Sequence, residues 1–150
     1  METSTPPAPL TLLVVEDNPE DLYIMHWVLK SHNFAYDLQV IDNGDRAMDY
    51  VNQFAHEERL RSPTIVLLDL HLPQVDGKEV LRQIKALPQG ADIPVVIVTS
   101  STNPADQHET LAMGADAYFV KPYQLHEFLW LGEVIKHLVF GTPPSFTQHI

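Results

Sequence analysis

The chain has 150 residues, a length that suits one ordinary domain with a sizeable buried core. Its 20 acidic residues outnumber 9 basic ones, and the resulting formal charge of −11 argues against binding to nucleic-acid backbones, which depends on Lys and Arg. The sequence contains no Cys, which excludes disulfides, thiol catalysis and thiolate metal sites. No apolar run approaches the roughly 20 residues of a membrane-spanning helix, and no signal-peptide pattern opens the chain, so we expect a soluble cytoplasmic protein.

Short apolar runs alternate with amphipathic stretches along the chain. Residues 1–9 are rich in Ser, Thr and Pro and are predicted to form a disordered tail. The runs that fit buried strands are Leu10–Val15, Asp37–Ile41, Thr64–Asp69, Pro94–Val98 and Ala117–Val120. The stretches that fit helices begin at Pro19, Gly44, Gly77, Pro104 and Gln124, and the last two end at Met113 and Phe140. Residues 10–140 are therefore predicted to form one α/β domain with a doubly wound parallel sheet, and residues 141–150 a second tail.

Polar residues with chemical potential follow the predicted strands directly. Glu16 and Asp17 close the first strand, Asp69 the third, Thr99 the fourth and Lys121 the fifth. Asp69 alone is more simply explained as a turn residue, since Asp is common in turns. The carboxyl ends of parallel strands share one edge of the sheet, however, so all five residues are expected to meet in one cleft.

Three carboxylates in one cleft repel one another and require a cation. An oxygen-only ligand set favours a hard ion such as Mg²⁺. With its charge partly neutralised, Asp69 could attack phosphorus to form an aspartyl phosphate, while Lys121 and Thr99 hold the transferred oxygens. A hydrolase of the haloacid dehalogenase type also forms an aspartyl phosphate, but it needs a second Asp two residues after the nucleophile, where this chain has His71.

Five motifs in order resemble the receiver domain of two-component response regulators. They are Val15-Glu16-Asp17-Asn18-Pro19, Leu68-Asp69-Leu70-His71-Leu72-Pro73 with Asp76-Gly77, Val98-Thr99-Ser100, Gly114-Ala115-Asp116-Ala117-Tyr118, and Lys121-Pro122. The resemblance covers about residues 10–140. It implies a flavodoxin-like receiver fold, with five parallel strands in the order 2-1-3-4-5, and phosphotransfer from the histidine of a sensor kinase to Asp69.

The resemblance also implies individual roles. Mg²⁺ would be held by Asp17, Asp69 and the backbone carbonyl of His71, with Glu16 acting through water. Thr99 and Tyr118 would form a switch in which the aromatic ring turns inward on phosphorylation, although a simple core or surface role for this Tyr remains open. The family pattern further leads us to expect a cis peptide bond before Pro122, which the sequence alone leaves undecided.

His71 and Ser101 each lie two residues after a site residue, Asp69 and Thr99 respectively. We therefore hypothesise that both side chains flank the route of an attacking water and set the lifetime of the phosphoryl group. The alternative is that they are solvated loop side chains.

The apolar residues of the last helix occupy an arc of roughly 220°, wider than one-sided packing needs. Either a tail or loops cover the excess, or it forms a partner surface. We favour a symmetric homodimer built on this helix and the edge of the fifth strand, with interface residues Trp130, Leu131, Val134 and Leu138.

A narrower resemblance concerns the stand-alone regulators that pair with bacterial, especially cyanobacterial, phytochrome kinases. It rests on the polar insert Gln53–Ser62, on Asp76-Gly77-Lys78-Glu79-Val80-Leu81, and on the run from Ile93 to Ser101. The chain is thus expected to be a single-domain signalling protein, not an enzyme acting on a separate substrate. The rival hypothesis is a pseudo-receiver, a binding or dimerisation module that never carries phosphate, and the intact set of site residues argues against it.

Overall fold

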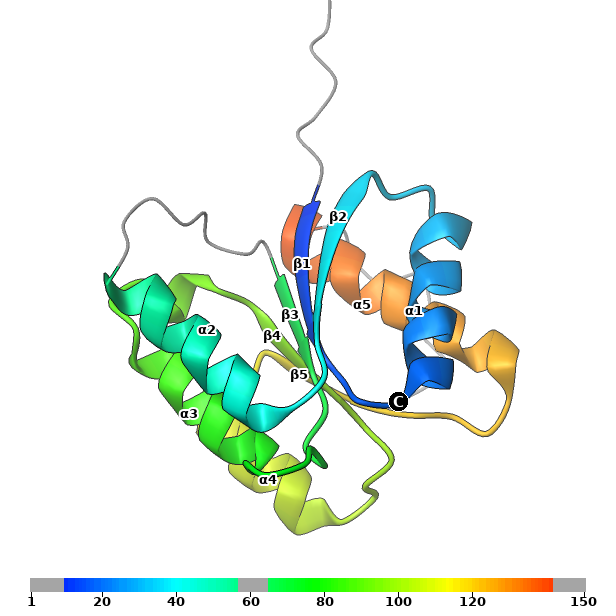
Figure 1. The fold of residues 1–150 in the computed structure, drawn as a ribbon. Helices are drawn as coiled ribbons and strands as arrows, with labels where there is room; N and C mark the ends of the chain where they lie inside the picture. The colour runs from blue at the N-terminus through cyan, green and yellow to red at the C-terminus, as the bar shows by residue number, and fades with distance from the viewer. Residues whose placement is uncertain (1–9, 57–64, 142–150) are drawn as a thin grey trace, which may run out of the picture.

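The computed structural model describes residues 10–56 and 65–141. Five parallel strands form one sheet in the order β2-β1-β3-β4-β5, as the resemblance implied. Helices α1 and α5 cover one face of the sheet, and α2, α3 and α4 lie on the other (Figure 1). The doubly wound α/β fold is therefore confirmed. The predicted tails at residues 1–9 and 141–150 lie outside the described residues, except for Gly141.

The elements follow the predicted alternation. The strands are β1 (Leu10–Val15), β2 (Tyr36–Ile41), β3 (Ile65–Leu68), β4 (Val95–Thr99) and β5 (Ala117–Val120). The α-helices are α1 (Pro19–Ser31), α2 (Gly44–His56), α3 (Gly77–Ala86), α4 (Pro104–Ala112) and α5 (Leu129–Phe140), and two 3₁₀ turns, η1 (Gly90–Asp92) and η2 (Leu125–Phe128), complete the order.

Successive residues of the central strands point to opposite faces of the sheet, so each strand contributes to two cores. Leu13 and Val15 of β1 pack with α2 and α3, whereas Leu12 and Val14 pack with α1 and α5. All four residues of β3 are buried. Burial on both faces explains why the central strands are continuous apolar runs, and it makes them a rigid mount for the residues that follow them.

Side chains cap the helices that begin at the carboxyl edge of the sheet. The Asn18 side chain accepts a hydrogen bond from the Glu20 amide at 2.9 Å, ahead of Pro19 in the first helical position. Asn103 caps α4 in the same way, by accepting from the Ala105 amide at 3.0 Å. These caps fix where each helix begins, and hence the shape of the loops around the site.

Helix α4 ends at Ala112, one residue before the predicted end at Met113. The predicted stop signal is present: Gly114 has a φ of 108°, a conformation that a side chain would disfavour.

Two predictions about the C-terminal region need correction. The prediction of one continuous helix from Gln124 to Phe140 was wrong, because the segment Leu125–Phe128 forms a 3₁₀ turn before α5 starts at Leu129. Apolar spacings of three and four residues fit both helix types, so the pattern could not separate them. The bond between Lys121 and Pro122 is trans, since the described residues contain no cis peptide.

Two glycines permit close contacts that a methyl group would block. A Cβ atom at Gly77 would lie 2.4 Å from the backbone oxygen of Asp69. A Cβ atom at Gly132 on α5 would lie 2.0 Å from Cδ2 of His32, whose ring also bonds to the Leu129 carbonyl at 2.9 Å through Nε2. Glycine thus lets α3 start against the loop after β3, and lets α5 pack against the end of α1.

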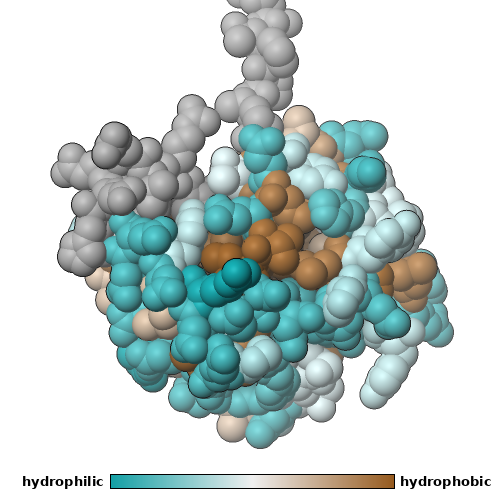
Figure 2. All heavy atoms as spheres, viewed as in Figure 1, coloured by the Kyte–Doolittle hydropathy of each residue, from teal (hydrophilic) through white to brown (hydrophobic). Residues whose placement is uncertain are grey.

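Polar residues predominate on the face that Figure 2 shows, and apolar side chains gather near its centre. Within residues 10–56 and 65–141, no helix combines the length and the apolar character needed to cross a membrane.

Candidate functional site

The predicted polar residues meet at the carboxyl edge of the sheet. Glu16 follows β1, Asp69 follows β3, Thr99 ends β4 and Lys121 follows β5. Glu16, Asp69 and Thr99 are only 1%, 5% and 0% exposed, whereas Asp17 is exposed. Because the neighbouring strands run parallel, residues more than 50 positions apart in the sequence contribute to one site.

The ammonium of Lys121 forms ion pairs with the carboxylates of this site. Its Nζ atom lies 2.8 Å from Oε2 of Glu16 and 3.1 Å from Oδ2 of Asp69. A third carboxylate, Asp21 in the first turn of α1, is closer still, with Oδ2 at 2.7 Å. Asp21 was not predicted to be a site residue, because an acid in the first turn of a helix is explained by the helix dipole alone.

The same edge can hold a cation. Glu16, Asp17 and Asp69 each offer a carboxylate oxygen, and these oxygens lie within 4.8 Å of one another. Oxygen-only donors suit Mg²⁺ or Mn²⁺. The backbone amide of His71 donates a hydrogen bond to Oδ1 of Asp69 at 3.2 Å. This bond fixes the orientation of the Asp69 carboxylate.

The charge balance also favours a cation. The pKa of Glu16 is raised from 4.5 to about 7, mainly because the carboxyl is buried; the nearby charge of Asp69 also raises this pKa, and hydrogen bonding to Lys121 lowers it. One ammonium therefore leaves the acidic cluster incompletely neutralised. A divalent ion would supply the missing positive charge.

Burial alone would lower the pKa of Lys121. Its hydrogen bonds to Asp21 and Glu16, together with the charges of Glu16 and Asp69, outweigh that effect and hold the pKa above its ordinary value. Lys121 is therefore a permanent cation in the site.

Thr99 is connected to the loop after β4. The Ser101 amide donates to Oγ1 of Thr99 at 3.3 Å, and the Tyr118 hydroxyl donates to the Ser101 carbonyl at 2.9 Å. The hydroxyl of Ser101 donates to Asp106 at 2.6 Å. The sequence grouped Thr99 with Tyr118, and the structure connects them through one loop residue.

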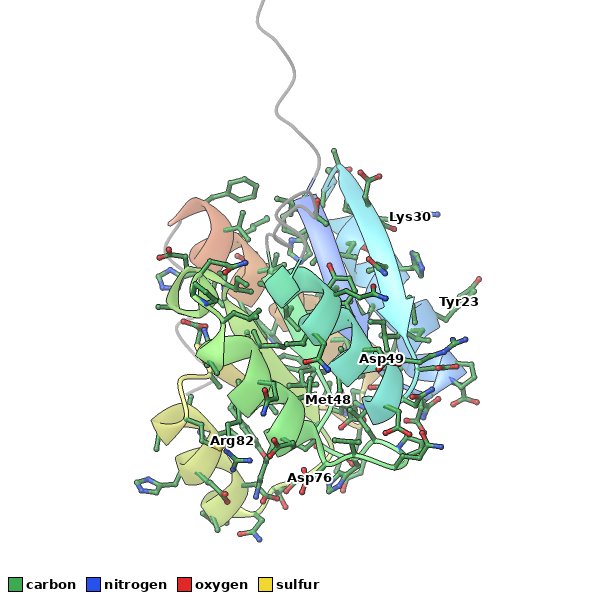
Figure 3. All side chains as sticks on the ribbon, turned by 60° about the vertical axis from the view of Figure 1, so that its left-hand side comes forward. Tyr23, Lys30, Met48, Asp49, Asp76 and Arg82 are labelled. Atoms are coloured by element: carbon green, nitrogen blue, oxygen red, sulfur yellow. The ribbon has the colours of Figure 1, made fainter. Side chains whose placement is uncertain are left out.

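A further ion pair flanks the site and was not foreseen. Lys78, at the start of α3, lies 2.7 Å from Oδ1 of Asp106 and 2.8 Å from Oε2 of Glu109, both on α4. Asp76, labelled in Figure 3, caps the start of α3 by accepting a hydrogen bond from the Lys78 amide at 2.9 Å. Only the fold brings Lys78 and α4 together, so no local sequence signal marked this contact.

Residues 12–130 match the family described as the response regulator receiver domain, which is most of the chain. The chain belongs to this family. Its receiver motifs are those that supply Glu16, Asp17, Asp69, Thr99 and Lys121 to the carboxyl edge.

Individual receiver proteins resemble the chain over most of their length. Response regulator Rcp1 of Synechocystis sp. is 34% identical over 119 residues, which is 79% of this chain and 81% of Rcp1. The probable methanogenesis regulatory protein FilR2 of Methanothrix harundinacea is 35% identical over 134 residues, or 89% and 85% of the two chains.

Solved receiver structures agree with the fold. The phosphorylated cyanobacterial phytochrome response regulator RcpA is 29% identical, with a TM-score of 0.78 over 91% of this chain and 97% of its own. The Mn²⁺-bound form of Rcp1 is 30% identical, with a TM-score of 0.77 over 92% of this chain and 100% of its own.

The predicted interface of this receiver domain must be narrowed. Leu131 is 1% exposed and packs in the core between α1, α5 and the sheet, so it is not a surface residue. Trp130 and Val134 line a cavity of about 260 Å³ beside β5, and Leu138 is half-buried. Packing of α5 against both the sheet and α1 accounts for part of the wide apolar arc.

Proposed function

We propose that the chain is a response regulator that accepts a phosphoryl group on Asp69 from a histidine of a sensor kinase, in a Mg²⁺-dependent reaction. The observation that carries the proposal is the convergence of Asp69 with two other carboxylates and the ammonium of Lys121 at one largely buried edge. Such an arrangement suits a nucleophilic carboxylate whose product bears additional negative charge.

Each residue has a distinct task. Asp17, Asp69 and the His71 carbonyl would hold Mg²⁺, with Glu16 acting through water. The cation supplies charge neutralisation at the transferred oxygens. A carboxylate oxygen of Asp69 forms the new bond to phosphorus while the bond to the donor nitrogen breaks, and the electron pair of that bond leaves with the imidazole. Lys121 and the Thr99 hydroxyl then hold phosphoryl oxygens.

Incubation with Mg²⁺ and a small phosphodonor such as acetyl phosphate, followed by intact mass measurement, tests this function. We expect wild type to gain one phosphoryl group and Asp69→Asn to gain none. Asp76→Asn is a matched control, because Asp76 caps α3 on the same loop and should leave phosphorylation intact. The pseudo-receiver alternative predicts no gain for any of these proteins.

The similarity to RcpA and Rcp1 supports a phytochrome kinase as the phosphodonor, because RcpA is described as a phytochrome response regulator. FilR2, a probable methanogenesis regulator, is equally similar in sequence, so the partner must be tested directly. Transfer of labelled phosphate from a phytochrome kinase, faster than from an unrelated sensor kinase, would support this assignment. Equal rates would count against it.

We further propose that phosphorylation acts through Thr99, Ser101 and Tyr118 on the surface formed by β5 and α5. The hydrogen bond from Tyr118 to Ser101 supports this route, since movement of Thr99 would alter the loop that Tyr118 holds. The signalling form would be a cytoplasmic homodimer that uses Trp130, Val134 and Leu138. A monomeric mass at high micromolar concentration, with and without phosphorylation, would exclude the dimer.

A further inference from the structure

The Lys121 ammonium lies within ion-pair distance of three carboxylates. An ammonium has three donors and no acceptor. Its three partners are Asp21 at 2.7 Å, Glu16 at 2.8 Å and Asp69 at 3.1 Å. Lys121 is thus fully engaged before any phosphoryl group arrives, and its longest contact is the one to the phosphoacceptor.

Asp21 is not needed to cap its own helix. It occupies the third helical position of α1, where an acidic side chain often bonds back to the amide of the capping residue. Here the amide of Asn18 instead donates to Oε1 of Glu16 at 3.1 Å. Asp21 therefore remains available to Lys121, and its side chain is only 15% exposed, which limits screening of the pair by water.

We propose that Asp21 is a positioning residue for Lys121: it holds the ammonium toward α1 and so weakens the grip of Lys121 on a phosphoryl group at Asp69. The inference rests on the proposed phosphotransfer function and adds a regulatory element to the same site. Lys121 divides one positive charge between α1 and the phosphoacceptor, and the negative charge of Asp21 also opposes the approach of an anionic donor.

Removal of the Asp21 charge should strengthen phosphoryl binding. In Asp21→Asn, the ammonium keeps only Glu16 and Asp69 as charged partners. At saturating Mg²⁺, determined separately for each variant, we expect the KM for acetyl phosphate to fall about fivefold while kcat changes less than twofold. The dissociation constant of beryllofluoride, a tetrahedral phosphoryl mimic, should fall by a similar factor in calorimetry.

Two variants serve as controls, and a third repeats the test. Asp21→Glu restores the charge and should return both constants toward wild type. Glu20→Gln removes one charge from the same helical turn, at an exposed side chain for which no contact to Lys121 is seen, and should change neither constant. Asp21→Ser is a second variant without the charge and should behave like Asp21→Asn.

The outcomes separate the inference from the function on which it rests. If wild type accepts no phosphoryl group and binds no beryllofluoride, the proposed function fails and the inference fails with it. If wild type is phosphorylated but the variants without the Asp21 charge show unchanged or higher KM, the inference alone is overturned. A fall in KM that Glu20→Gln reproduces would indicate a general charge effect and would also overturn it.

Discussion

Binding of a divalent cation should depend steeply on pH because of Glu16. Its carboxyl has a pKa of about 7 in the fold, so about one tenth of the molecules carry the charge at pH 6 and about nine tenths at pH 8. A cation that needs the ionised group should therefore bind about tenfold more tightly at pH 8 than at pH 6. Calorimetric titration with Mg²⁺ at both values measures this ratio, and Glu16→Gln should reduce it to near unity.

When no cation is added, the free energy of unfolding should fall as pH rises. Because folding raises the pKa of Glu16 from 4.5 to about 7, its favourable contribution is fully present below pH 4.5 and is lost as pH rises through 7. The loss amounts to about 3 kcal/mol, since each pKa unit corresponds to about 1.4 kcal/mol. Urea unfolding between pH 5 and 8 measures it, against Glu16→Gln as the reference that lacks the titrating group.

Two results would refute this reasoning. One is a wild-type Mg²⁺ affinity that does not change between pH 6 and pH 8. The other is an equally steep pH dependence in Glu16→Gln, which would assign the titration to a different group. Addition of saturating Mg²⁺ at pH 8 should restore the stability lost by ionisation, and failure to do so would separate the cation from Glu16.

Two contacts away from the carboxylates give further predictions. Gly132→Ala should lower the free energy of unfolding by about 2 kcal/mol, because the added methyl overlaps the His32 ring. His32→Ala in the same chain should recover part of the loss. An unchanged urea midpoint for Gly132→Ala would show that the ring moves freely. Tyr118→Phe should lower the free energy of unfolding by about 1 kcal/mol, because the hydrogen bond to the Ser101 carbonyl is lost. Tyr123→Phe changes a fully exposed ring and should leave the free energy of unfolding unchanged. Equal urea midpoints for the two variants would contradict the contribution of this hydrogen bond.

The architecture could be predicted because its signals are local. Buried central strands are apolar on both faces, as in Ile65–Leu68, and helix starts carry recognisable caps such as Asn18 before Pro19. The convergence of Glu16, Asp69 and Lys121 followed from the parallel sheet alone. The order of the strands could not be derived from the parallel sheet. It was predicted only from the resemblance to a known family.

The unforeseen features depend on contacts between distant parts of the chain. Asp21 and Lys121 are in contact although they lie 100 positions apart in the sequence, and nothing near Asp21 in the sequence indicates which way its carboxylate turns. The same is true of Lys78 and Asp106. The 3₁₀ turn before α5 was missed for a different reason, since the burial pattern around Phe128 is compatible with either helix type.

The absence of a side chain at Gly77 has a consequence for how the molecule could move. The Cβ position of Gly77 is only 2.4 Å from the Asp69 carbonyl, and its amide donates to the Leu70 carbonyl at 3.1 Å, so the start of α3 and the peptide of Asp69 are tightly coupled. Any movement of α3 along the sheet would also displace Asp69, the proposed phosphoacceptor. If Asp69 is phosphorylated as proposed, we expect α3 to stay in place and the loop between β4 and α4 to move, because Ser101 in that loop is held only by individual hydrogen bonds.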